Sequence, residues 1–135
     1  MLIKFLEPNF IFEDERGLLI QLVRDGFKQV NYITAKKNNI RGGHFHKFNR
    51  EAFFVISGKF DLDLSDLENE VQEKHTISAG EFFEIQPNVL HSFKFLEETQ
   101  LISMYSSGVE LKDGSKDIFV NSNHLLCTNL RENYI

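Results

Sequence analysis

The 135-residue chain lacks several features that mark specialised classes of protein. Its single cysteine, Cys127, excludes an internal disulfide and is typical of a reducing compartment. A net charge of −5 is not the basic surplus of a general nucleic-acid binder. The apolar residues 1–8 are far too few for a membrane span or a signal peptide. We therefore expect a soluble cytoplasmic protein that binds neither nucleic acid nor membrane.

Helical periodicity is almost absent, and short alternating runs separated by turn residues take its place. No internal repeat, low-complexity stretch or linker interrupts the chain. Because 135 residues can bury one hydrophobic core, we expect a single domain over residues 1–135. Fourteen phenylalanines and no tryptophan indicate a thick apolar interior or a buried subunit interface. Many short strands at this spacing predict an all-β sandwich or barrel.

The predicted strands follow the alternation of apolar and polar residues. In residues 59–65, Phe60, Leu62 and Leu64 are expected to point inward and the aspartates between them outward. A polar turn at residues 66–70 makes residues 58–77 a long hairpin, whereas residues 121–135 show no readable element. The other predicted strands are residues 2–6, 10–12, 18–23, 29–34, 51–57, 82–85, 91–95 and 101–105.

The N-terminal strands show no obvious hairpin partner in the sequence. A strand left with a bare edge promotes aggregation, so pairing with a second subunit is expected. We therefore predict a homodimer, with exchange of strands between subunits as one form of it.

Two histidines and a glutamate dominate residues 41–58. His44 and His46 are two residues apart, so on an extended strand they project from the same face. Glu51 opens residues 51–57, a run whose two faces are both largely apolar, which predicts a strand buried on both sides. A carboxylate in that layer would be costly unless an arginine, or a metal ion beside the imidazoles, compensated its charge.

A second stretch, residues 80–95, adds a third imidazole. A short strand and a turn place His91 at the head of another strand, where it shares a face with Phe93 and Phe95. Three imidazoles and one carboxylate can bind a divalent zinc, iron or nickel ion with positions left open for substrate. The same imidazoles could instead do acid–base work in a metal-free pocket, and the pattern leaves both forms open. The candidate ligands are His44, His46, Glu51 and His91.

The spacing His-x-His, four residues, Glu, six residues, Gly in residues 44–58 resembles the first cupin motif, and residues 80–91 resemble the second. The second motif departs from the family at Gln86, where cupins favour proline, and at Asn88, where they favour glycine. Asparagine tolerates the left-handed turn that glycine would supply. The resemblance implies an all-β cupin jelly roll, also called a double-stranded β-helix.

From Phe12 to Phe119 the chain resembles two groups of small cupins that process nucleotide-linked keto-sugars for bacterial surface polysaccharides. One group is the dTDP-4-keto-6-deoxyhexose 3,4-ketoisomerases, metal-free stand-alone proteins with an Arg-Gly-x-His-x-His-Lys stretch like residues 41–47. The other is the epimerising cupin domain of bifunctional capsule-biosynthesis enzymes, which carries a metal. Glu51 matches the metal-binding group, whereas Lys47 and the chain length match the ketoisomerases.

The resemblance implies an isomerase that enolises a nucleotide-linked 4-keto-6-deoxyhexose at C3. A metal ion or an imidazolium near the carbonyl oxygen would stabilise the charge that develops when the C3 proton leaves. Histidine is suited to take that proton because its pKa lies near neutrality. Return of the proton to the opposite face of C3 gives an epimer, and its delivery to C4 gives a 3-keto sugar. Both outcomes stay open.

The expected roles depend on whether a metal is bound. In the metal-bound form the three histidines and Glu51 are ligands, and Tyr32, or next Tyr105, is the expected base. In the metal-free form the resemblance implies His46 as base and His44 as acid.

Binding of the nucleotide calls for a few local cations. Arg41 precedes a Gly-Gly turn and is expected to bind the pyrophosphate bidentately, although an exposed loop charge is the alternative. Lys47 and Arg24 are further candidates. Two other classes of function stay open: a metal-dependent redox cupin such as a small dioxygenase, and a non-catalytic sugar-binding module.

Overall fold

The structure is a computed structural model and describes residues 1–120, so the expectations for residues 121–135 and Cys127 lie outside the described residues. The described chain has twelve strands and no helix, which confirms the all-β class. No helix long and apolar enough to cross a membrane is thus present in residues 1–120. The strands are β1 (Ile3–Phe5), β2 (Phe10–Asp14), β3 (Gly17–Gln21), β4 (Gln29–Ala35), β5 (Ile40–Phe45), β6 (Glu51–Ser57), β7 (Lys59–Asp66), β8 (Val71–Ser78), β9 (Phe82–Ile85), β10 (Val89–Phe95), β11 (Thr99–Tyr105) and β12 (Phe119–Val120).

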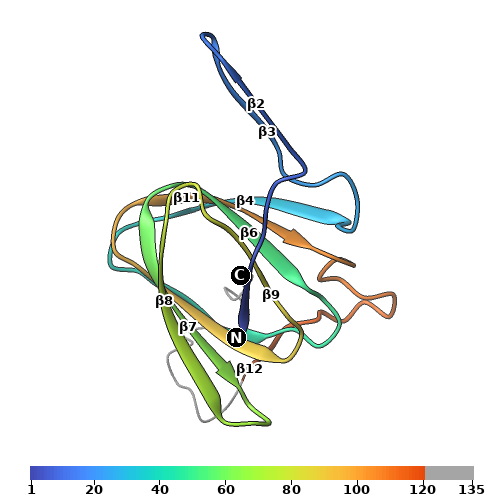
Figure 1. Cartoon of the computed structure of the whole chain (residues 1–135). Coiled ribbons are helices and arrows are strands. Elements are labelled where there is room, and N and C mark those ends of the chain that lie inside the picture. The colour runs from blue at the N-terminus through green and yellow to red at the C-terminus, as the bar shows by residue number, and fades with distance from the viewer. Residues whose placement is uncertain (121–135) are drawn as a thin grey trace.

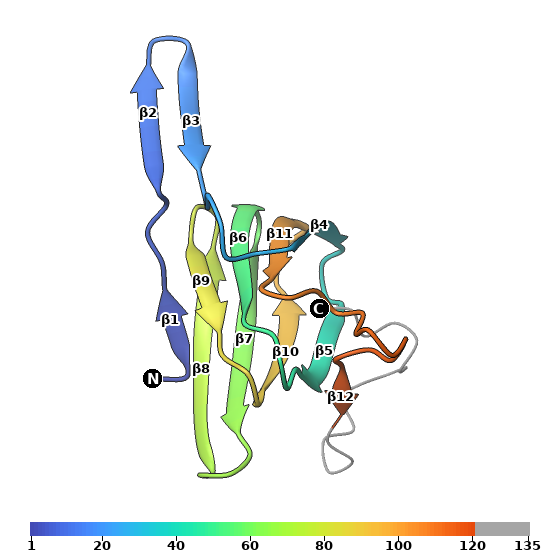
Figure 2. The ribbon, with the colours of Figure 1, turned by 90° about the vertical axis from the view of Figure 1, so that its right-hand side faces the viewer.

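Two five-stranded antiparallel sheets face each other and form the body of the molecule (Figure 1). The first sheet has the strand order β1-β9-β6-β11-β4 and the second the order β12-β5-β10-β7-β8. From β4 onward the chain crosses between the sheets at almost every connection, as in a jelly roll (Figure 2). The β5–β6, β9–β10 and β11–β12 connections meet at one end of the barrel, where the N–H of Asn88 donates to the carbonyl of His46 and the N–H of Lys47 to the carboxylate of Asp117.

Phenylalanine rings fill the space between the sheets. Phe53 and Phe83 come from the first sheet, and Phe60, Phe93 and Phe95 from the second; all five are fully or almost fully buried. Phe53 stacks on Phe83 with ring centroids 5.2 Å apart, and Phe60 lies 5.1 Å from Phe93. The large number of phenylalanines thus serves a thick apolar interior, as the composition indicated.

The predicted strands agree with the structure to within two residues at each end. β6 and β9 begin and end where expected, and β7 and β8 form the predicted long hairpin. The extended strand expected for His44 and His46 is confirmed for His44 by β5, but β5 ends at Phe45 and His46 lies in the loop just after it. The strand β12 was not predicted.

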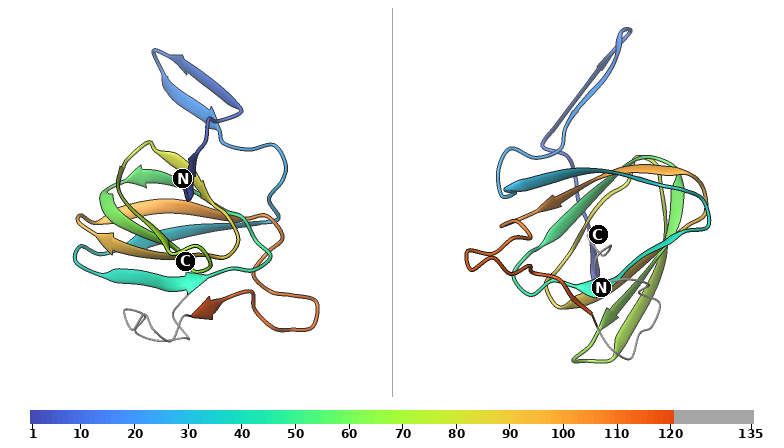
Figure 3. Two further views of the ribbon diagram at one scale, coloured as in Figure 1. Left: turned by 60° about the horizontal axis from the view of Figure 1, so that its bottom comes forward. Right: turned by 180° about the vertical axis from the view of Figure 1, so that it is seen from behind.

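The expectation that the N-terminal strands lack a hairpin partner is wrong. β2 pairs with β3 across a tight turn that joins Asp14 to Gly17, and β1 pairs with β9. The turn is closed by Arg16, which donates to the carboxylate of Asp14 at 2.6 Å. The β2–β3 hairpin projects away from the barrel (Figures 1 and 3). The two strands pair with each other, but no other part of residues 1–120 covers the exposed apolar side chains of the hairpin.

The strand β6 is buried on both faces over most of its length. Phe53 and Val55 point into the barrel, while Ala52 packs outside with Phe82 and Met104. Partly buried side chains of the β3–β4 connection pack against this outer cluster. The predicted two-sided burial is therefore confirmed for most of β6, although Ile56, near its end, is 42% exposed.

Candidate functional site

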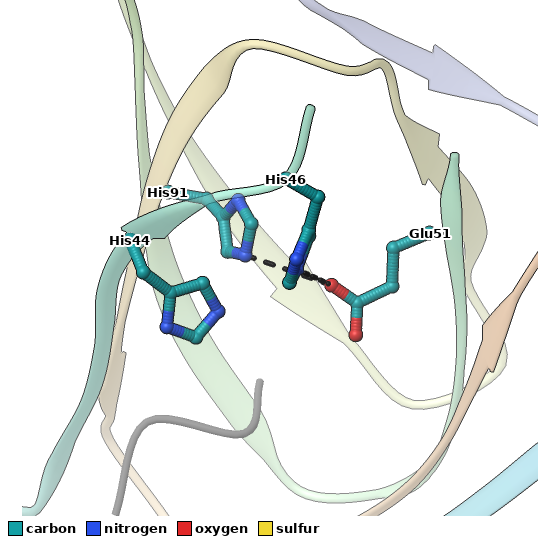
Figure 4. A group of neighbouring side chains, drawn as sticks. All are labelled: His44, His46, Glu51 and His91. Carbon is teal, nitrogen blue, oxygen red and sulfur yellow. Dashed lines mark hydrogen bonds and ion pairs between the residues drawn. The ribbon is translucent and has the colours of Figure 1, made fainter. Parts of the chain in front are cut away.

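Four buried polar side chains meet inside the barrel, at the end where the β5–β6 and β9–β10 connections lie (Figure 4). His44 comes from β5, His91 from β10, Glu51 from the start of β6 and His46 from the loop before it. None is more than 3% exposed, and one potential ligand atom from each lies within 4.8 Å of the others. The fold thus brings together the four residues that the two motifs singled out.

The backbone of β5 and β10 sets the positions of two imidazoles. His44 and His91 are cross-strand partners, with a bulge just after His91. Gly42 has a φ of 95°, and a Cβ there would lie 2.6 Å from the main-chain oxygen of His91, so glycine is required for this close approach. Asn88 adopts the expected left-handed conformation, and its N–H donates to the carbonyl of His46 at 2.7 Å. The second motif is therefore tied to the first.

Main-chain carbonyls determine which ring nitrogen of two histidines faces the centre. Nδ1 of His46 lies 2.6 Å from the carbonyl oxygen of Asp117. Nδ1 of His91 lies 3.1 Å from the carbonyl oxygen of Val89. A carbonyl can only accept, so each Nδ1 carries a proton. Both Nε2 atoms then face Glu51, whose Oε1 lies 3.0 Å from His46 and 3.6 Å from His91.

Several polar atoms of this cluster make no hydrogen bond within residues 1–120. They are both ring nitrogens of His44, Nε2 of His91 and Oε2 of Glu51. Unpaired buried polar atoms are rare because burial without a partner is costly. Converging imidazole and carboxylate lone pairs are the donor set of divalent transition metals, so these four residues could hold one such ion.

Burial shifts the protonation of the cluster. Burial, helped by the neighbouring imidazoles, lowers the pKa of His44 well below its usual range, and burial lowers the pKa of His91 to about 3. Burial raises the pKa of Glu51. Burial also opposes charge on His46, but the hydrogen bond and charge of Glu51 outweigh it and raise the pKa of His46. Without a cation, the His46–Glu51 pair therefore shares a proton beside two neutral imidazoles.

The two tyrosines predicted as bases differ in their relation to the cluster. Tyr105 is 1% exposed, lies opposite Glu51 in the β6–β11 register, and has its ring centroid 5.1 Å from that of His46. Burial, and then the charge of Glu51, raise the pKa of Tyr105 so far that its hydroxyl stays protonated. Tyr32 is 63% exposed, and its hydroxyl donates to Gln100 at 3.0 Å. The chain therefore places Tyr105 at the cluster and Tyr32 outside the barrel.

The three predicted phosphate-binding cations are all exposed. Arg41 lies on β5, three residues before His44, and Lys47 directly follows His46, with its Nζ 4.2 Å from the ring centroid of Phe119. Arg24 lies in the connection between β3 and β4. Arg41 and Lys47 thus lie on either side of the pair His44 and His46 in the chain, and phosphate binding by all three cations stays a prediction.

Sequence reasoning missed two buried residues that organise the loop after His46. Asn49 is 1% exposed and Asp117 is fully buried. Asp117 is 71 residues from His46 in the chain, so no motif spacing links the two. The position of Asp117 next to the apolar residues 118–120 is only a weak hint that it is buried. The polar residues 112–116 before it ordinarily indicate an exposed loop.

Comparison with solved structures finds that the chain is similar to several sugar-modifying enzymes. It is 26% identical to the TDP-quinovose 3,4-ketoisomerase WlaRB from Campylobacter jejuni, with a TM-score of 0.73 over 92% of this chain and 96% of that one. A 3,4-ketoisomerase from Helicobacter canadensis is 20% identical, with a TM-score of 0.73 over 93% and 96% of the two chains. The RmlC epimerase from Mycobacterium tuberculosis is 16% identical, with a TM-score of 0.66 over 79% of this chain and only 64% of its own. No curated protein matches significantly.

These likenesses confirm the cupin-like all-β fold and the predicted resemblance to the ketoisomerase group. The family described as the polysaccharide biosynthesis C-terminal domain matches residues 12–118, which include both motifs and all four clustered side chains. The chain therefore belongs to the polysaccharide biosynthesis C-terminal domain family.

Proposed function

We propose that this chain is a cytoplasmic isomerase that enolises a nucleotide-linked 4-keto-6-deoxyhexose at C3. The observation that carries the proposal is the buried cluster, in which neutral imidazoles with unpaired nitrogens lie beside a proton shared by His46 and Glu51. Such a site offers a proton acceptor and a proton donor within a few ångströms of each other. The likeness to a 3,4-ketoisomerase over nearly the full length of both chains supports this substrate class.

The reaction needs one proton removed from carbon and one returned to carbon. The 4-keto group makes the C3 proton acidic, and the charge left behind spreads onto the carbonyl oxygen. Each preorganised donor aimed at that oxygen is worth about 3–4 kcal/mol of barrier. For ketoisomerisation the C3 proton is replaced by one at C4 while the hydroxyl proton moves from O3 to O4, so atoms and charge balance. For epimerisation the proton returns to the opposite face of C3.

The contacts favour His44 as the base and His46 as the acid. Both nitrogens of His44 are unpaired, and its lowered pKa keeps the ring neutral, so it can accept a proton. Both nitrogens of His46 are already hydrogen-bonded, one of them to Glu51 in the pair that holds a proton. This assignment reverses the order that the family resemblance implied.

The same residues fit a divalent cation, which defines a second form of the site. His44, His46, Glu51 and His91 would hold the ion, and it would supply positive charge next to the carbonyl oxygen. In that form Tyr105 would act as a proton donor and not as the base that the sequence predicted, because burial keeps its hydroxyl protonated and its ring lies against His46.

Ketoisomerisation is the favoured outcome. The ketoisomerase from Campylobacter jejuni aligns over 96% of its own length, whereas the epimerase from Mycobacterium tuberculosis aligns over 64%. We expect a nucleotide-linked 3-keto sugar as the main product, with the pyrophosphate held by Arg41 and Lys47.

We also propose a homodimer in which the β2–β3 hairpin packs on a second copy. An isolated two-stranded hairpin is marginal in water, and a contiguous exposed apolar surface marks an interface. The outer face of the first sheet offers a matching surface that includes Val30, Tyr32 and Ile56. The half-exposed large side chains of the hairpin are Phe10, Ile11, Phe12, Leu18 and Leu19.

Proton NMR in deuterated water tests the reaction. The protein is incubated with dTDP- or UDP-linked 4-keto-6-deoxyglucose, as purified and after chelation. Loss of the C3 proton signal together with a new 3-keto sugar is the expected result, and a 3-epimer would select the other outcome. Activity that survives full chelation selects the metal-free form. No exchange at C3 with or without added metal would contradict the isomerase, and ligand binding without exchange would then favour a sugar-binding module.

A further inference from the structure

Asp117 is a fully buried aspartate at the end of the long β11–β12 connection. All of its polar groups are hydrogen-bonded. Its N–H donates to the carbonyl of Val109 at 2.8 Å, and its own carbonyl accepts from His46. Because it contacts one of the four clustered side chains, its other contacts bear on the site.

The carboxylate of Asp117 lies in a concave arrangement of backbone donors. The N–H groups of Lys47, Phe48 and Asn49 donate to it at 2.7, 3.0 and 3.0 Å, and Nδ2 of Asn49 donates at 2.8 Å. Successive main-chain N–H groups that converge in this way bind anions, and here the anion is part of the chain. The carboxylate is therefore fixed relative to the loop that starts directly after His46.

The carbonyl of the same residue contacts the ring of His46. Its oxygen lies 2.6 Å from Nδ1, and a carbonyl accepts but never donates, so the proton is on Nδ1. Nε2 then faces Glu51 at 3.0 Å. One residue thus holds both the loop after His46 and the orientation of its ring.

Asn49 connects this arrangement to the start of the β11–β12 connection. Its side-chain oxygen accepts from the N–H groups of Ser107 and Gly108, and its Nδ2 donates to the carbonyl of Gly108 as well as to Asp117. Both ends of the connection are therefore attached to the loop after His46, which leaves the Asp117 carbonyl little freedom to move away.

We propose that Asp117 is a positioning residue of the site: its carboxylate anchors residues 47–49, and its main-chain carbonyl holds His46 with the proton on Nδ1 and Nε2 toward the reacting centre. The effect on turnover rests on the proposed function, whereas the state of the His46 ring does not. The role holds for the metal-free and the cation-bound form, since both need the lone pair or shared proton of Nε2 to face the cluster.

The first test uses the unsubstituted protein. Long-range ¹⁵N–¹H correlation spectra of histidine side chains, assigned with His46→Gln, should show a proton on Nδ1 of His46. An unprotonated Nδ1 in the folded protein would overturn the proposal. This measurement needs no substrate, so it stands even if the isomerase activity proves wrong.

The second test compares Asp117→Asn with Asp113→Asn. The control lies in the same connection, but within residues 1–120 its exposed carboxylate accepts hydrogen bonds only from Ser115, so we expect it to leave the spectrum and turnover unchanged. For Asp117→Asn we expect a changed His46 signal and a kcat lower by about 10- to 100-fold, with KM within about twofold. A folded Asp117→Asn with the unaltered His46 signal and unaltered kcat refutes the positioning role.

A third variant covers the case in which Asp117→Asn does not fold. Asn49→Ala removes one donor to the same carboxylate without touching His46 directly. We expect a smaller change of the His46 signal in the same direction, and an unchanged signal would contradict the proposal. If no variant, nor the parent protein, turns over any substrate, the proposed function fails and the spectra alone decide the role of Asp117.

Discussion

The two ends of the barrel interior are built on the same strands but differ in composition: one end is packed with aromatic rings and the other holds the polar cluster. On β6, Glu51 is followed two residues later by Phe53, and on β10, His91 is followed by Phe93. Alternation along a strand places both members of each pair on the inward face. One end is packed with rings 5–6 Å apart, and the other holds unpaired nitrogens and a carboxylate. The apolar end gives the polar end a rigid, water-poor wall, which strengthens its electrostatics.

The comparison predicts that the polar end controls chemistry with little effect on stability. His44→Gln should lower C3 proton exchange by about 10²- to 10⁴-fold, because it removes the proposed acid–base group. Its unfolding free energy should change little, since both nitrogens of His44 are unpaired in the described chain. NMR exchange rates check the loss of activity, and urea unfolding checks the unchanged stability. Full exchange activity in the variant would contradict a role of the polar end in the chemistry.

The packed end should show the opposite pattern. Phe93→Ala should lower the unfolding free energy by about 3–5 kcal/mol, because it opens a cavity among buried rings. Phe48→Ala is the control: Phe48 is 62% exposed, so its loss should stay within about 0.5 kcal/mol. Urea unfolding measures both changes. Equal losses would show that the ring cluster is not the source of stability.

A cation bound at the polar end should raise the stability of the whole fold, because the ion binds the folded protein and not the unfolded chain. Zinc at about 100 times its dissociation constant should stabilise the protein by about 2.7 kcal/mol, seen as a higher midpoint of thermal unfolding. Glu51→Gln removes the charged ligand and should abolish most of that shift without preventing folding, since a buried carboxylate is itself costly. The metal-bound form is contradicted if zinc leaves the parent protein unaffected.

The backbone under the polar end should also affect stability. Gly42→Ala combines a left-handed φ with a contact 2.6 Å from the His91 oxygen, whereas Gly80→Ala has a similar φ and no neighbour within 4 Å. We expect about 1–2 kcal/mol of destabilisation for Gly80→Ala and a larger loss for Gly42→Ala, accompanied by reduced exchange activity. Similar losses for the two variants would show that the close approach to His91 does not matter.

Most of the strands and the four clustered residues could be predicted because their signals are local. Alternation identified β7, short largely apolar runs identified β6 and β9, and motif spacing identified His44, His46, Glu51 and His91. Tyr32 shows the limit of such reasoning. Tyr32 lies on a correctly predicted strand, but which face of β4 turns outward depends on how β4 pairs with β11. The Tyr32 side chain lies on the outer face, where its hydroxyl donates to Gln100.

The sequence by itself determined the strand pattern, the identity of the four clustered side chains and the apolar interior, because each shows in a local pattern or motif of the chain. The tertiary structure alone decided three other features: the pairing of β2 with β3 as a projecting hairpin, the outward position of Tyr32 and the contact of Asp117 with His46. The physical reason is that these features arise from side chains and edges that meet only after the sheets have paired. A carbonyl that approaches a ring 71 residues away leaves no periodic trace in the sequence.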